Sequence, residues 1–139
     1  MSTYKAVFSD IDGTLLTSEH IVSTATIEAI ASLQDKNIPF VIISSRSASC
    51  IYPILEKHHF QCPIVACGGA WIEDMNGRIL SNEGMSKQTA ATVIEFMTEK
   101  KFNLAWGIYS GKNWITNDRT DARILHEESV VAVSYTHLR

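Results

Sequence analysis

Three short apolar runs, separated by segments of helical length, constrain the fold of this 139-residue chain more than any other feature. The runs cover residues 6–8, 38–43 and 64–66, are rich in Val, Ile and Phe, and are bounded by turn-forming residues. Runs of this kind are typical of strands that are buried on both faces. Helical connections between them favour right-handed crossovers, so the pattern predicts an α/β protein with a parallel sheet.

Two helices are expected between these strands. A helix is expected up to about Lys36, because apolar residues recur there at helical spacing. Ser23 precedes this helix and can cap it. A second helix is expected over residues 48–58, and it contains Pro53. This proline either kinks the helix or opens it as a first-turn residue.

The pattern changes after the third strand. Residues 70–72 and 78–80 flank Asn76-Gly77, which is a strong hairpin signal. Ser86 then caps a helix to about Lys101, and an α+β layer is predicted to follow. Its elements are strands over 103–109 and 114–116 and a short helix over 119–127. A boundary between two regions is expected near residues 80–84.

Bulk properties exclude several classes of protein. An apolar content of 45% and a mean hydropathy of +0.02 fit a globular protein of 15.5 kDa with a core. A net charge of −3 offers no basic patch for nucleic acid. No apolar run reaches the roughly 20 residues of a membrane span, and no signal-peptide pattern is seen, so a cytoplasmic location is expected. The cysteines lack metal-ligand spacing and are expected to be reduced thiols.

The first strand leads into two carboxylates, in the run Asp10-Ile11-Asp12-Gly13-Thr14. Ligands of parallel α/β sheets bind at the carboxyl ends of the strands. Two aspartates placed there can divide labour between a metal-bound nucleophile and a proton donor. The alternative is that both are turn formers, with Gly13 supplying a flexible backbone.

Other phosphate and metal motifs are excluded. An EF-hand calcium loop needs Gly at its sixth position, where Leu15 stands. Neither G-x-G-x-x-G nor G-x-x-x-x-G-K-[ST] occurs in the chain. Phosphate chemistry in this chain would therefore need a different set of binding residues.

Ser44 and Arg46 follow the second strand. Since successive strands of a parallel sheet are commonly neighbours, the Ser44 hydroxyl is expected to face the two carboxylates. The alternative is that Ser44 caps the next helix.

These features together resemble the haloacid dehalogenase superfamily: a strand ending in D-x-D-G-T-L, a helix, a strand ending in Ser-x-Arg, and a hairpin leading to an α/β insert. The chain is most similar to the Cof-like sugar-phosphatase branch, whose members carry a large α/β cap. The resemblance implies a Rossmann-like three-layer α/β core, with residues 1–82 as its first half and residues 83–132 as a partial α+β cap.

The resemblance also implies roles for individual residues. Asp10 would be the nucleophile that takes the phosphoryl group, and it would bind Mg²⁺. Asp12 would protonate the leaving oxygen and later activate water, and its backbone carbonyl would reach the same metal. Ser44 and Gly13 would contact the substrate phosphate, and Arg46 would either contact it as well or support the scaffold of the site. The implied substrate is a small phosphorylated metabolite such as a sugar phosphate.

The chain departs from the family pattern in several places. Gly68 stands where the family has Asn, and the family's lysine and late Gly-Asp-x-x-x-Asp segment are not found. These departures predict a C-terminally truncated and inactive chain. Residues 133–139 read like a translated sequencing adapter and are interpreted as a non-native tail.

The sequence also permits rival interpretations. A phosphomutase would share the Asp-x-Asp-Gly-Thr motif. A non-catalytic fragment would bind Mg²⁺ or self-associate through an exposed edge of the first strand. Three aromatic residues of the second region either line a substrate face or pack its strands: Trp106, Tyr109 and Trp114.

Overall fold

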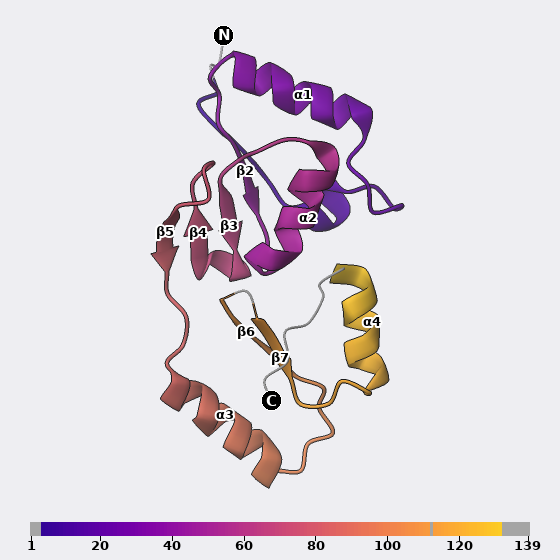
Figure 1. The fold of residues 1–139 in the computed structure, drawn as a ribbon, viewed down its shortest axis with the longest axis vertical. Helices are drawn as coiled ribbons and strands as arrows, with labels where there is room; N and C mark the ends of the chain where they lie inside the picture. The colour runs from indigo at the N-terminus through magenta and orange to yellow at the C-terminus, as the bar shows by residue number, and fades with distance from the viewer. Residues whose placement is uncertain (1–3, 112, 132–139) are drawn as a thin grey trace. The chain divides into compact units, whose positions relative to one another are not determined.

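The computed structural model describes residues 4–111 and 113–131. The chain forms two compact units, which comprise residues 1–83 and 84–139 (Figure 1). Residues 133–139, interpreted above as a non-native tail, lie outside the described residues.

The first unit is built on a five-stranded sheet with the order β1-β2-β3-β4-β5. The first three strands are parallel, and β4 and β5 continue the sheet antiparallel. This mixed sheet with crossover helices confirms the predicted α/β fold class. The strands are β1 (Val7–Ser9), β2 (Phe40–Ile43), β3 (Ile64–Ala66), β4 (Trp71–Glu73) and β5 (Ile79–Asn82).

Helix α1 (Thr24–Asp35) connects β1 to β2, and α2 (Ala48–His58) connects β2 to β3 (Figure 1). Ser23 caps α1 as predicted, because its Oγ accepts from the Thr26 N–H at 3.2 Å. Pro53 lies inside α2 and does not open it. Ile30 of α1 and Ile51 of α2 are almost fully buried in the core of the unit.

The predicted hairpin joins β4 and β5. Asp74 Oδ1 accepts from the N–H groups of Asn76 and Arg78, at 2.8 and 3.0 Å. Gly77 has φ +76°, a conformation that glycine adopts without steric cost. The Asn-Gly signal is therefore confirmed.

The second unit contains α3 (Lys87–Glu99), the strand pair β6 (Gly107–Ser110) and β7 (Asn113–Thr116), and α4 (Ala122–Val131). The helix after Ser86 is confirmed, and the Ser86 Oγ accepts from Thr89 N–H at 3.0 Å.

Two boundaries in this unit differ from the prediction. The strand expected from residue 103 begins only at Gly107, because the preceding backbone bonds to a side chain. Asn117 accepts from Trp106 N–H at 2.9 Å and donates to the Leu104 carbonyl at 3.1 Å. The helix expected from residue 119 begins at Ala122, after Asp118 accepts from Thr120 N–H in a tight turn.

None of the helices in the described part of the chain combines the length and apolar character that crossing a bilayer requires. Cys50, Cys62 and Cys67 are thiols, in agreement with the prediction.

Candidate active site

The two aspartates and Ser44 lie at the same edge of the sheet. Strands β1 and β2 are parallel with Ser9 beside Ile42, so their carboxyl ends lie together. Asp10 directly follows β1, and Ser44 directly follows β2. The expected juxtaposition of the two strand ends is thus present.

A wide turn over Ile11–Leu15 presents the acidic side chains. It is closed by hydrogen bonds from Leu15 N–H to the Asp10 carbonyl at 3.2 Å and from Leu16 N–H to the Ile11 carbonyl at 3.0 Å. Ile11 and Leu15 are buried and anchor the turn, whereas Asp10 and Asp12 stay exposed. The alternation of apolar and acidic residues therefore turns the carboxylates outward.

The Asp10 carboxylate is only partly engaged. Its Oδ1 accepts from the Ile11 N–H at 2.7 Å. No other group in the described part of the chain bonds to this carboxylate. One of its oxygens is therefore available to an electrophile or a cation.

Asp12 is paired with Arg46. Arg46 Nε donates to Asp12 Oδ2 at 2.9 Å, and Arg46 Nη2 donates to Asp12 Oδ1 at 2.7 Å. The Arg46 side chain is 9% exposed and the Asp12 side chain 52% exposed. A bidentate contact of this kind fixes the orientation of both side chains. Sequence reasoning selected both residues but missed this pairing.

Ser44 is buried and orders the loop after β2. Its Oγ accepts from the Arg46 N–H at 3.1 Å, and its carbonyl accepts from the Gly68 N–H at 3.0 Å. The next helix begins after Ser47, so Ser44 does not cap it. The Ser44 hydroxyl proton remains able to donate, because its oxygen serves as the acceptor in the Arg46 contact.

Gly13 allows the turn to form. Its φ is +71°, in the left-handed region, and a Cβ built on it would meet no atom within 4 Å. Glycine is therefore favoured at this position because of the backbone conformation and not because a larger side chain would clash.

The donor set at this edge suits a hard cation. Mg²⁺ takes oxygen ligands and commonly binds through one or two carboxylates while keeping several waters. Asp10 supplies a carboxylate here, and Asp12, two positions further along the chain, adds its backbone carbonyl, since both of its carboxylate oxygens accept from Arg46. The described residues hold no cluster of three or more His, Cys, Asp or Glu side chains placed to bind a metal.

The aromatic residues of the second unit pack on one another. Tyr109 and Trp114 are directly opposite across β6 and β7, with ring centroids 5.7 Å apart and ring planes 13° apart. Trp114 is only 5% exposed. This geometry favours strand packing over a substrate face for these two rings.

Comparison with known proteins extends these observations. The chain is 32% identical over 136 residues to a Haemophilus influenzae protein named as a candidate phosphatase, covering 94% of this chain and 49% of that protein. It is 27% identical over 124 residues to the Bacillus subtilis 5-amino-6-(5-phospho-D-ribitylamino)uracil phosphatase, covering 89% and 42%. The chain thus spans about half the length of the curated relatives it matches.

A solved haloacid dehalogenase subclass IIB sugar phosphatase has the same fold over 94% of this chain and 50% of its own, with a TM-score of 0.71 and 18% identity. The model of the haloacid dehalogenase-like hydrolase family matches residues 7–137, which include the aspartate turn and the Ser44 loop. The chain belongs to the haloacid dehalogenase-like hydrolase family.

Proposed function

We propose that this chain is part of a Mg²⁺-dependent phosphatase of the Cof-like branch, which acts on small phosphorylated metabolites such as sugar phosphates. The observation that carries the proposal is the Asp10 carboxylate, held outward at the end of β1 with one oxygen unengaged within the described structure. We assign residues 1–82 to the first half of the core and residues 83–132 to part of the cap.

In the first step, an Asp10 carboxylate oxygen attacks the phosphorus atom. The bond from phosphorus to the leaving oxygen breaks, and that oxygen takes a proton from Asp12. The product is an aspartyl-phosphate and a free alcohol. In the second step, Asp12 takes a proton from water, the water oxygen attacks phosphorus, and the Asp10 carboxylate is restored with release of phosphate.

The pairing of Asp12 with Arg46 bears on its proposed role. Both Asp12 oxygens accept from Arg46, so Asp12 must lose one of these hydrogen bonds when it carries a proton. Arg46 would therefore act as a positioning residue that orients the Asp12 carboxylate. Its positive charge would also attract the substrate phosphate. The Ser44 hydroxyl and the backbone at Gly13 would donate to phosphoryl oxygens.

Mg²⁺ would be held by the Asp10 carboxylate and the Asp12 backbone carbonyl, and it would offset the negative charge that Asp10 and the phosphate bring together. The residues of this chain supply the remaining chemistry: attack, proton transfer and orientation.

The substrate class rests on the relatives. One relative is named for its action on 5-amino-6-(5-phospho-D-ribitylamino)uracil, which carries a phosphorylated ribityl chain. The fold is shared with a sugar phosphatase. Both names describe small phosphate monoesters of polyhydroxylated compounds.

The test is hydrolysis of p-nitrophenyl phosphate with Mg²⁺ by this chain extended with the second half of the Haemophilus influenzae relative. We expect activity that Asp10→Asn lowers by at least about 10²-fold, because a nucleophile is lost. We expect the 139-residue chain alone to be inactive. Activity that survives Asp10→Asn would refute the nucleophile, and a folded but inactive extended chain would favour a binding role. Phosphoryl transfer to a sugar phosphate in place of water would indicate a phosphomutase.

A further inference from the structure

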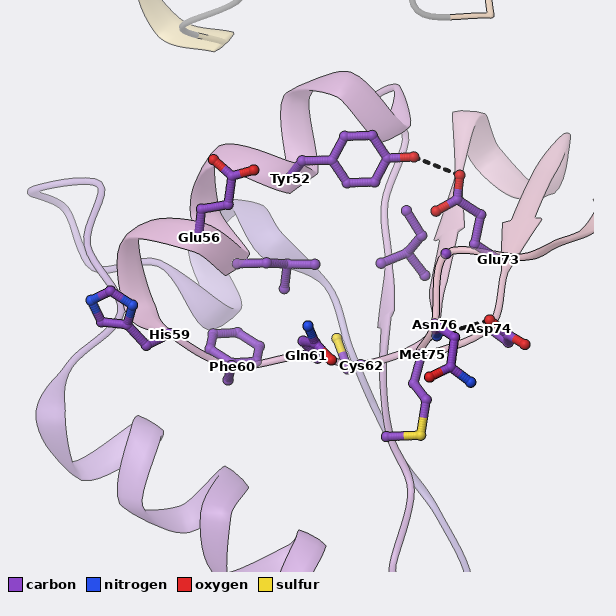
Figure 2. Close-up of a pocket in the computed structure, with 13 residues that line it drawn as sticks. Tyr52, Glu56, His59, Phe60, Gln61, Cys62, Glu73, Asp74, Met75 and Asn76 are labelled. Atoms are coloured by element: carbon purple, nitrogen blue, oxygen red, sulfur yellow. Dashed lines mark hydrogen bonds between the residues drawn. The ribbon is translucent and has the colours of Figure 1, made fainter.

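A groove of about 830 Å³ lies at the other end of the sheet from Asp10 and Ser44. It is lined by the end of α2, by the segment that leads into β3, and by the β4–β5 hairpin (Figure 2). Because β3 runs parallel to β1 and β2, its start lies opposite to the edge that carries the aspartates. The groove is therefore separate from the candidate active site.

A buried carboxyl group lies in the wall of this groove. Glu73 is 4% exposed. Its Oε1 accepts from the Tyr52 hydroxyl at 2.5 Å and from Trp71 Nε1 at 2.6 Å. Figure 2 shows Tyr52 reaching from α2 to this oxygen, while the second Glu73 oxygen lies on the side that faces α2.

The second oxygen of Glu73 has no protein partner within the described part of the chain, and no Lys or Arg there forms an ion pair with it. Burial of a carboxylate without a cation is costly, because neutral donors replace only part of its hydration. The Tyr52 hydroxyl cannot supply a cation. Desolvation and the neighbouring Glu73 raise the pKa of Tyr52 above its usual range, so this group stays a neutral donor.

The other ionisable residues of the groove favour a cationic ligand over an anionic one. Glu56 and Asp74 add two acidic groups to the groove, and His59 is its one basic side chain. An anionic ligand, such as a phosphorylated substrate, would be repelled by these acidic groups. The groove also falls short of a metal site, because no cluster of three metal-ligating side chains is found among the described residues.

Apolar side chains share the same walls, notably Leu55, Phe60 and Met75. Phe60 and Met75 lie below the Tyr52–Glu73 pair in Figure 2. A ligand that fits would combine one positive charge with an apolar body.

We propose that this groove binds a small organic cation, a protonated amine on an apolar group, with its ammonium hydrogen-bonded to the second oxygen of Glu73. The ammonium supplies the cation that the buried carboxyl lacks, and the apolar body packs on Phe60 and Met75. The proposal is independent of the phosphatase chemistry, since no residue is shared between the two sites.

The test uses benzylammonium as a probe and benzyl alcohol as its neutral match. Each is titrated into the 139-residue chain, and binding is followed by amide chemical shifts in NMR spectra. We expect benzylammonium to bind at least about tenfold more tightly, because a charged hydrogen bond to a buried group is stronger than a neutral one. The shifts should be confined to the end of α2 and the β4–β5 hairpin. Equal affinity of the two probes would overturn the proposal, and this comparison needs no variant.

A variant then tests the role of Glu73. Glu73→Gln keeps an oxygen for Tyr52 and Trp71 but places an N–H₂ group where the ammonium would bind. We expect its affinity for benzylammonium to fall to that of benzyl alcohol, while Glu28→Gln on the exposed face of α1 leaves binding unchanged. Unchanged binding in a folded Glu73→Gln chain would overturn the assignment.

Discussion

At the scale of the residue, Gly13 offers a test of why the aspartate turn forms. A Cβ at Gly13 would meet no atom within 4 Å, but the φ of +71° disfavours an L side chain. We expect Gly13→Ala to lower the free energy of unfolding of the first unit by about 1–2 kcal/mol, measured by urea denaturation.

Gly84→Ala is the matched control for this change. Gly84 also has open space around its Cβ position, but its φ lies outside the left-handed region. It should be neutral or stabilising by up to about 1 kcal/mol, because alanine restricts the unfolded chain. Equal destabilisation by both changes would mean that backbone conformation is not the cause at Gly13.

At the scale of the element, the helix caps carry a second prediction. Ser23 and Ser86 each accept from the N–H three residues on, at the starts of α1 and α3. Replacement of either by Ala should cost about 1 kcal/mol, because an N–H at the helix start loses its partner. Hydrogen exchange of backbone amides should show Ser23→Ala loosening α1 and Ser86→Ala loosening α3. Loss of protection in both units from one change would contradict their description as separate compact units.

At the scale of the whole molecule, the edge of the main sheet predicts association. Within the described structure β1 pairs with β2 alone. Val7 N–H bonds to the Pro39 carbonyl, so Phe8, the next residue, presents its N–H to the other side. Phe8 is also 61% exposed. An unpaired apolar edge of this kind invites pairing with another chain.

We therefore expect light scattering to show oligomers whose share grows with concentration. Phe8→Lys should reduce them, because a charge on an edge strand opposes pairing. Leu80→Lys on β5 is the matched control, since Leu80 is equally exposed at the opposite edge. An equal effect of both variants would place the contact elsewhere.

Local signals in the sequence predicted several turns, caps and strands correctly. Ser23, the Asn76-Gly77 turn and the run over 64–66 were predicted correctly, because their signals lie within a few residues of the structure they form. The start of β6 was predicted wrongly. Asn117 lies 11 residues from Trp106, and its side chain takes the N–H that a strand partner would have taken.

The sequence alone determined the order of strands and helices, the caps and turns, and the position of Asp10 and Asp12 after the first strand. These depend on local backbone preferences and on apolar periodicity. The fold was needed to reveal that Arg46 bonds to Asp12, 34 residues away, and that Tyr52 bonds to the buried Glu73, 21 residues away. Such contacts depend on which strands become neighbours and on which side chains are buried. Neither property can be read from a short stretch of sequence.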